Sequence, residues 1–358
     1  MLGRTFNEGD PYHQLLSVIP QRTPNLNHLE LGLQAHINIA VYDSITESLS
    51  RLRHLRLPPY ACLPGFTMFI RSDELETLAF GYEIDTVEQA RSLIMWDYIR
   101  SPIILPPERF PGLKIVELCC SVERATEFFL SLIPQERCLE EIRLCVPAGQ
   151  FGPAHPSRHQ IRELHLAIVR SVPELRKVHI RFATDHTNFE ATASVDLNIG
   201  LKDLVQAEDL QPFISCEKLQ SFRFYHPYPV SINHHELKDL VSHWRSLTEL
   251  AITPDPFLPP DRYPLHMKIL GWPALHVVAR HNPMLVTLEL LLVDPRSRGL
   301  YSPALLKAIR KSLHKLSHLK SFDVGPLCFL PLFFRGDRAE VWALSSRRLF
   351  TTRYIFDD

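Results

Sequence analysis

The chain carries one alternation of apolar and polar positions that returns along most of its length. A six-residue phrase, apolar-x-x-apolar-x-apolar, occurs ten times, and its first position is leucine in every copy. The last three positions alternate as in a short strand, and the first leucine is expected to pack into the same interior. Ten copies that share their first residue indicate a repeat architecture. The copies lie at 26–31, 52–57, 75–80, 113–118, 139–144, 175–180, 219–224, 247–252, 285–290 and 319–324.

The segments between the phrases show the periodicity of amphipathic helices. Apolar residues recur every three or four positions, with charged residues opposite, at 121–132, 160–172, 236–244 and 303–316. The first leucines of successive copies are 23 to 44 residues apart. This alternation of strands and helices predicts an α/β fold in which parallel strands form one sheet and helices form an outer layer.

The phrase resembles the strand segment of ribonuclease-inhibitor-like leucine-rich repeats. Its irregular, helix-bearing form is similar to fungal-type F-box/leucine-rich-repeat proteins, as at 23–31 and 316–322, and the resemblance covers about residues 11–325. It implies a horseshoe-shaped solenoid of about ten repeats, with a parallel concave sheet and an irregular helical convex side. It also implies a protein-interaction role, as a substrate-recognition subunit of a cullin-type ubiquitin ligase.

Two departures separate the chain from that family. The Asn or Cys that usually follows each strand is mostly missing, since Gln34, Tyr60 and Pro227 stand in that place. No F-box is visible either: residues 105–108 imitate the opening of one, but the phrase at 113–118 follows too closely for a helical bundle. Whether an F-box precedes Met1 in the full gene product stays open.

The repeats also predict the domain limits. Residues 1–325 are expected to form one continuous solenoid, because each repeat buries its apolar face only against its neighbours. Residues 1–22 would form an N-terminal helix or cap, and residues 326–358 would form a C-terminal cap that covers the last repeat.

The composition and the spacing of glycine, cysteine and histidine argue against several classes of enzyme and metal site. The chain has 54 leucines and 29 prolines but only 13 glycines, and no glycines stand at the spacings of a dinucleotide-binding loop, a P-loop or a nucleophile elbow. The seven cysteines form no C-x-x-C pair, and Asp239 replaces the second histidine of a zincin-like helix start at His235. No apolar run is long enough for a membrane span. We therefore expect a non-enzymatic cytoplasmic or nuclear protein without a catalytic residue, metal or cofactor.

A net charge of −1 gives no global reason to expect nucleic-acid or membrane binding. The local pattern is different. The outward strand positions form a column of Glu30, Arg56, Ala79, Glu117, Arg143, His179, Arg223, Ala251, Glu289 and Asp323.

Basic residues gather at the centre of the predicted concave face, and aromatic residues stand on the strand exits and proline-rich loops beside it. We hypothesise that they recognise an acidic or phosphorylated protein segment. Two alternatives are that the arginines pair with acids across strands while the aromatics pack their own loops, and that the basic face binds nucleic acid. The residues of the hypothesis are Arg143, Lys177, His179, Arg181, Arg223, Tyr225, Tyr228, Phe257 and Tyr263.

Overall fold

In a computed structural model, the chain forms two compact units. The first unit comprises Met1–His155, Leu166–Glu174 and Asp185–Thr187, and the second comprises Pro156–His165, Leu175–Thr184 and Asn188–Asp358. The structure describes residues 18, 22–23, 25–30, 51–57, 74–80, 111–132, 138–146, 156–182, 204–253, 266–292, 307, 311–312, 314–323 and 353–355.

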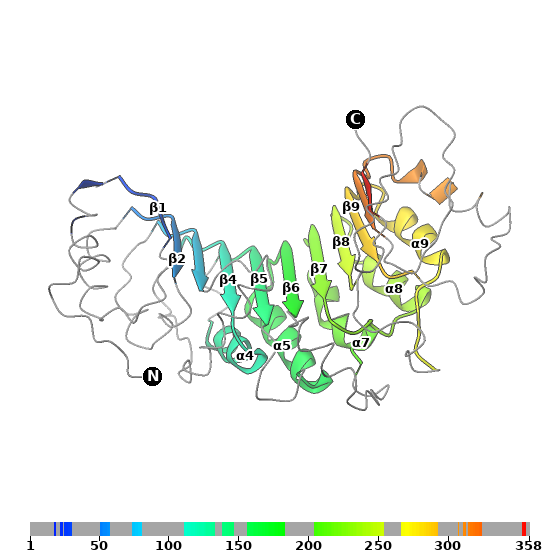
Figure 1. Cartoon of the computed structure of the whole chain (residues 1–358), viewed down its shortest axis with the longest axis horizontal. Coiled ribbons are helices and arrows are strands. Elements are labelled where there is room, and N and C mark those ends of the chain that lie inside the picture. The colour runs from blue at the N-terminus through cyan, green and yellow to red at the C-terminus, as the bar shows by residue number, and fades with distance from the viewer. Residues whose placement is uncertain are drawn as a thin grey trace, which may run out of the picture. The chain divides into compact units, whose positions relative to one another are not determined.

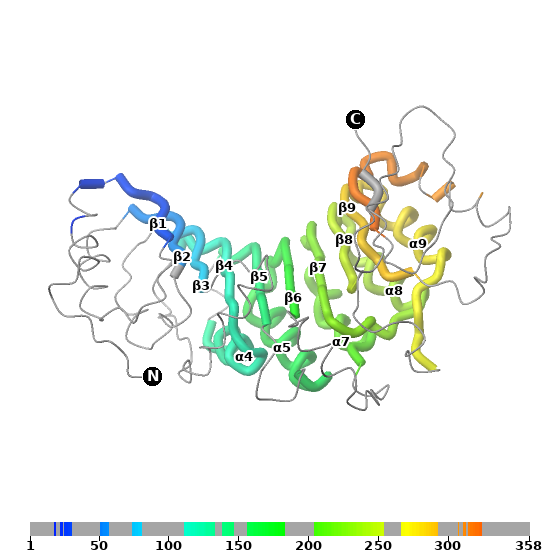
Figure 2. The backbone as a smooth tube through the Cα atoms, in the orientation of Figure 1, coloured from blue at the N-terminus to red at the C-terminus, as the bar shows by residue number. Residues whose placement is uncertain are grey.

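Five strands of the first unit pair in parallel and follow one another in the sheet in chain order. Helix α4 connects the last two of them and lies beside them in Figures 1 and 2. The elements are β1 (His28–Glu30), β2 (His54–Leu57), β3 (Thr77–Phe80), β4 (Ile115–Cys119), α4 (Val122–Ser131) and β5 (Glu141–Val146).

The second unit repeats this arrangement. Its strands β6 to β10 pair in parallel in chain order, and a short β11 pairs antiparallel with β10. Helix α8 packs against α7 and α9. The elements are β6 (Lys177–Phe182), α7 (Ala207–Leu210), the 3₁₀ helix η5 (Gln211–Ser215), β7 (Ser221–Tyr225), α8 (His234–Val241), β8 (Glu249–Ile252), α9 (Pro273–His281), β9 (Thr287–Leu290), β10 (Ser321–Asp323) and β11 (Arg353–Ile355). Helix α5 (Arg158–Ser171) begins in the second unit and ends in the first.

Each strand has one apolar and one polar face, because side chains alternate along it. On β6, Val178, Ile180 and Phe182 are buried, while Lys177 and Arg181 on the opposite face are exposed and His179 is half-buried. In each unit, we call the face of the sheet that carries the outward strand positions, such as Lys177 on β6, the polar face. The strand pairings place the predicted column on this face in each unit: Glu30, Arg56, Ala79, Glu117 and Arg143 in the first, and His179, Arg223, Ala251, Glu289 and Asp323 in the second.

The first leucine of the phrase anchors each strand in the core. It is buried in nine of the ten copies and half-buried at Leu26. The residue after it offers its carbonyl to two N–H groups of the next repeat, as Asn27 does to Arg53 and His54, both at 2.9 Å. This shared acceptor sets the register of the following strand. It recurs at Arg53, Glu76, Lys114, Arg176, Gln220, Thr248 and Val286.

All ten predicted strands are present, and three predicted helices lie within two or three residues of their expected limits at α4, α5 and α8. The expected α/β leucine-rich-repeat fold is thereby confirmed from its strands. The predicted helix at 303–316 is described only in part, and most of the proposed caps at 1–22 and 326–358 lies outside the described residues. Helix α9, α7 and η5 were not predicted.

Candidate functional site

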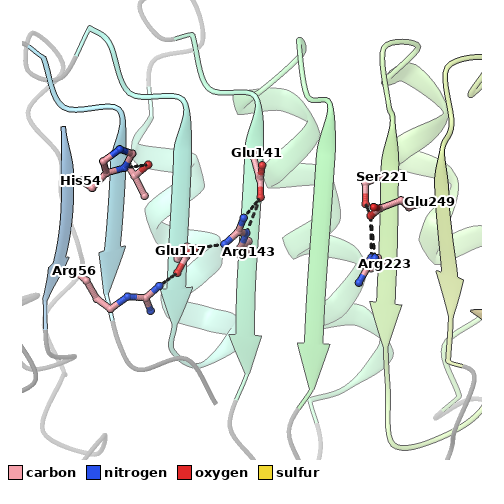
Figure 3. A network of polar contacts seen from close by, with 9 residues as sticks. His54, Arg56, Glu117, Glu141, Arg143, Ser221, Arg223 and Glu249 are labelled. Carbon is pink, nitrogen blue, oxygen red and sulfur yellow. Dashed lines mark hydrogen bonds and ion pairs between the residues drawn. The ribbon is translucent and has the colours of Figure 1, made fainter. Parts of the chain in front are cut away.

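On the first unit, ion pairs cross the polar face from strand to strand (Figure 3). Arg56 on β2 reaches over β3 to Glu117 on β4, with its Nη2 atom 2.5 Å from the Glu117 Oε2 atom. The residue beneath this pair is Ala79, which is only 2% exposed. A small side chain on the middle strand therefore allows the pair to close.

Arg143 on β5 is held by two acids. Its Nη1 atom lies 2.6 Å from the Glu117 Oε1 atom, and both its Nε and Nη2 atoms lie 2.6 Å from the Glu141 Oε1 atom. The carboxylates of Glu117 and Glu141 are 14% and 11% exposed. Burial alone would lower the pKa of Arg143, but Glu141 and Glu117 outweigh it and raise that pKa above its ordinary value. The guanidinium is thus paired with one acid of its own strand and one acid of the neighbouring strand.

On the second unit, the polar face of β6 and β7 is cationic. The register places Lys177 opposite Ser221, His179 opposite Arg223, and Arg181 opposite Tyr225. None of these six residues is an acid, and Lys177 and Arg181 are exposed. We call Lys177, His179, Arg181 and Arg223 the β6–β7 cationic patch.

Arg223 contacts an acid on the next strand. Its Nε and Nη2 atoms both lie 3.1 Å from the Glu249 Oε2 atom, and the hydroxyl of Ser221 donates to the same oxygen at 2.8 Å. Within the described part of the chain, Glu249 is the acid that contacts Arg223. The cross-strand pairing considered from the sequence is therefore present at both Arg143 and Arg223.

Tyr225 is a positioned hydrogen-bond donor. Its hydroxyl donates to the Glu289 Oε2 atom at 2.8 Å, across Ala251 on β8, and its ring lies 5.4 Å from the ring of His179. Burial raises the pKa of Tyr225, Glu289 adds to the rise, and Arg223 and Arg181 oppose it. The phenol stays protonated, with two guanidinium groups close enough to influence it.

The remaining aromatic residues of the hypothesis are placed differently. Tyr228 is 7% exposed and lies beside His226, with ring centroids 5.7 Å apart. Such burial favours a structural role for its ring. Phe257 and Tyr263 lie outside the described residues.

Other side chains that could take part in catalysis or metal binding have structural roles. Glu236 of the zincin-like segment closes a capping box at the start of α8, accepting from the backbone N–H of Asn233 at 3.0 Å. His165 is fully buried, its Nδ1–H donates to the carbonyl of Asp209 at 2.6 Å, and burial lowers its pKa to about 4. Among the described residues, no group of three His, Cys, Asp or Glu side chains could hold a metal ion, and no helix there has both the length and the apolar character of a membrane span.

Two acids and two alanines matter more than the sequence alone indicated. Glu249 and Glu289 face the arginine and tyrosine of β7 only because the strands are in this register. Ala79 and Ala251 stood in the predicted column without an assigned role. Their small size between charged neighbours is a signal that could have indicated cross-strand pairs.

No family model matches the chain, and no curated protein matches it. Three similar solved structures are the leucine-rich-repeat protein LegL7 from Legionella pneumophila, the Rad7–Elc1 complex in yeast, and the TLR13–ssRNA13 complex, each at 12% identity. The matches cover 88%, 83% and 84% of this chain and 97%, 65% and 40% of the other chains, with TM-scores of 0.38, 0.32 and 0.30. Matches this distant assign the chain to no family.

Proposed function

We propose that the chain is a non-enzymatic protein-interaction module that binds an acidic or phosphorylated segment of a partner protein at the β6–β7 cationic patch. The observation that carries the proposal is the register of β6 and β7. It sets Lys177, His179, Arg181 and Arg223 on one face, and no acid stands at the facing positions of these two strands.

The chemistry of the patch suits carboxylates and phosphates. A guanidinium offers parallel N–H groups that match either group, and charge-assisted hydrogen bonds of this kind are among the stronger polar contacts. Arg181 and Arg223 provide two such forks, and Lys177 adds a point charge. The side chains stand on strands rather than on loops, so little backbone freedom is lost on binding.

Within the proposal, Arg143 has a structural role. Two poorly exposed carboxylates already hold it, whereas Arg223 contacts one acid, Glu249, in the described part of the chain. A partner would have to draw Arg143 away from Glu117 and Glu141, and separating charges from acids that water reaches poorly is costly.

A protein segment fits the face better than nucleic acid does. Glu249, Glu289 and Asp323 share the polar face of the second unit with the patch. A polynucleotide carries a continuous line of phosphates, which these acids would repel. A protein segment can place its anionic residues on the patch alone.

The test is selection from a phage-displayed library of random peptides on the immobilised chain. We expect the wild type to enrich acidic peptides, and Lys177→Glu/Arg181→Glu to lose them, because the reversed charges repel the same residues. Synthetic glutamate-rich and phosphoserine-containing peptides then separate the two sources of negative charge.

The matched control is Lys218→Glu/Arg245→Glu, which makes the same charge change at exposed positions of the second unit beside the strand entries. It should enrich the same acidic peptides as the wild type. Enrichment that survives in the patch variant would contradict the proposal. Binding of poly-uridylate RNA in preference to every acidic peptide would favour the nucleic-acid alternative.

A finer proposal is that the chain is a substrate receptor of a cullin-type ubiquitin ligase, and it rests on the family resemblance alone. It predicts that cullin adaptor proteins co-purify with the chain from native cells. Their absence beside another stable partner would contradict this role and leave the interaction module standing.

A further inference from the structure

We infer that Glu249 is an internal occupant of the anion site, which a partner's carboxylate or phosphate displaces from Arg223. The inference rests on the proposed function and adds a selectivity element to it. In the free protein, the Glu249 carboxylate contacts Arg223 (Figure 3). In the proposed complex, an anionic group of the partner takes this position.

The geometry of the contact leaves room for a better ligand. Three donors, the Ser221 hydroxyl and the Nε and Nη2 atoms of Arg223, converge on a single oxygen of Glu249. The favourable arrangement of an arginine with a carboxylate or phosphate is a fork in which two parallel N–H groups meet two oxygens. Glu249 does not provide this arrangement, whereas an incoming group that is not tied to β8 can.

The exposure of the pair permits the exchange. The side chains of Arg223 and Glu249 are 29% and 36% exposed. Ion pairs that water reaches contribute little to stability, so opening this one costs little. Glu249 can then return to solvent without leaving a buried charge.

Neighbouring basic groups favour the binding of an anionic partner after Glu249 has moved. Once Glu249 has moved, Arg223 stands with His179 at the facing register position and with Arg181 beside Tyr225. Both guanidinium groups already influence Tyr225. A partner group bound there would gain the combined field of the patch.

Selectivity follows from this competition. A segment with few negative charges does not displace Glu249, whereas a strongly anionic segment does, so weak partners are rejected. Neutralising Glu249 should therefore tighten binding, the opposite of what the loss of a direct partner contact would do.

The experiment measures fluorescence anisotropy of a fluorescein-labelled deca-glutamate peptide with the full chain at near-physiological salt. Glu249→Gln should bind the peptide about two- to fivefold more tightly than the wild type, the range expected for release of an exposed ion pair. Ser221→Ala, which removes one of the three donors that hold Glu249, should shift the affinity in the same direction by less.

Glu289→Gln is the matched control. It makes the same change of charge on the same face, but its carboxylate accepts from Tyr225 and not from Arg223. Equal gains in Glu249→Gln and Glu289→Gln would reveal a general charge effect and overturn the inference. So would a Glu249→Gln variant with wild-type or weaker affinity and an unchanged melting temperature.

The two proposals fail in different ways. If the wild type binds neither this peptide nor a phosphoserine-containing peptide, or if Lys177→Glu/Arg181→Glu binds as well as the wild type, the proposed function is wrong. If the wild type binds and the patch variant does not, but Glu249→Gln gains nothing, only the role of Glu249 is wrong.

Discussion

Ala79 on β3 and Ala251 on β8 occupy corresponding positions on the polar face of their units. Each is almost fully covered, and each lies between strands whose side chains meet above it, Arg56 with Glu117 in one case and Tyr225 with Glu289 in the other. Strands two apart in a sheet are separated by about 10 Å, so only long side chains over a small residue can make such contacts.

Ala79→Leu should therefore destabilise the chain. The larger side chain would enter the space beneath the Arg56–Glu117 pair and separate the two charges. We expect a loss of about 1–3 kcal/mol in the free energy of unfolding, the usual range for overpacking, measured by urea denaturation. Ala79→Ser is the control, since a side chain of similar size leaves the pair closed; equal losses in both variants would contradict this explanation.

His165 makes stability depend on pH. Its pKa is lowered from 6.5 to about 4 in the folded protein because burial disfavours the charged imidazole. Between pH 4 and pH 6.5, His165 is protonated in the unfolded chain but neutral in the folded chain. The stability it contributes is therefore complete above about pH 6.5 and falls as the pH drops toward 4. The loss should reach at most about 3 kcal/mol.

The measurement is the free energy of unfolding as a function of pH for the wild type and His165→Gln. The amide of glutamine can still donate to the Asp209 carbonyl but does not titrate. The curve of the variant should be flatter between pH 4 and 6.5. Parallel curves would show that His165 does not contribute to the slope.

At the scale of elements, the strands could be predicted because one phrase recurs with leucine at the same position. The helices α4, α5 and α8 could be predicted from their amphipathic stripes, in which charged residues stand opposite the apolar ones. Helix α9 was missed because its apolar residues Ala274, Leu275, Val278 and Ala279 stand in a segment with few charges. Pro273 at its first turn, a frequent helix start, was the available signal.

Asn282 links two of these elements. It follows α9, is fully buried, and its side-chain Nδ2 donates to the carbonyls of Trp244 at 2.7 Å and Val241 at 3.3 Å at the end of α8. The same carbonyls also accept from the backbone N–H groups of Trp244 and Leu247, so the amide adds a second donor to each and joins the ends of the two helices.

Asn282→Ala should lower the free energy of unfolding by about 1–3 kcal/mol, because it removes two buried hydrogen bonds between the ends of α8 and α9, each worth about 0.5–1.5 kcal/mol. Hydrogen exchange should also quicken in α8 and α9 before it does in β6. Met284→Ala, an exposed position two residues away, should leave both measurements near wild type. An Asn282→Ala variant as stable as the wild type would contradict the linking role.

At the scale of the whole molecule, the near-zero net charge conceals a separation of charge on the second unit. Its polar face carries the cationic patch on β6 and β7, and acids on β8, β9 and β10. The sequence could predict which residues share this face, since strand periodicity decides it. It could not predict which arginines are held by acids, because that depends on register and on side-chain reach across a third strand.

The central claim is that anionic protein segments bind at the β6–β7 cationic patch. A zero-length carbodiimide reaction tests it, because it joins the carboxylates of a bound deca-glutamate peptide to lysine amines in direct contact with them. Mass spectrometry should find the peptide on Lys177, and Lys177→Arg should remove that product. Cross-links concentrated on Lys218 or Lys238, with Lys177 unmodified, would contradict the claim.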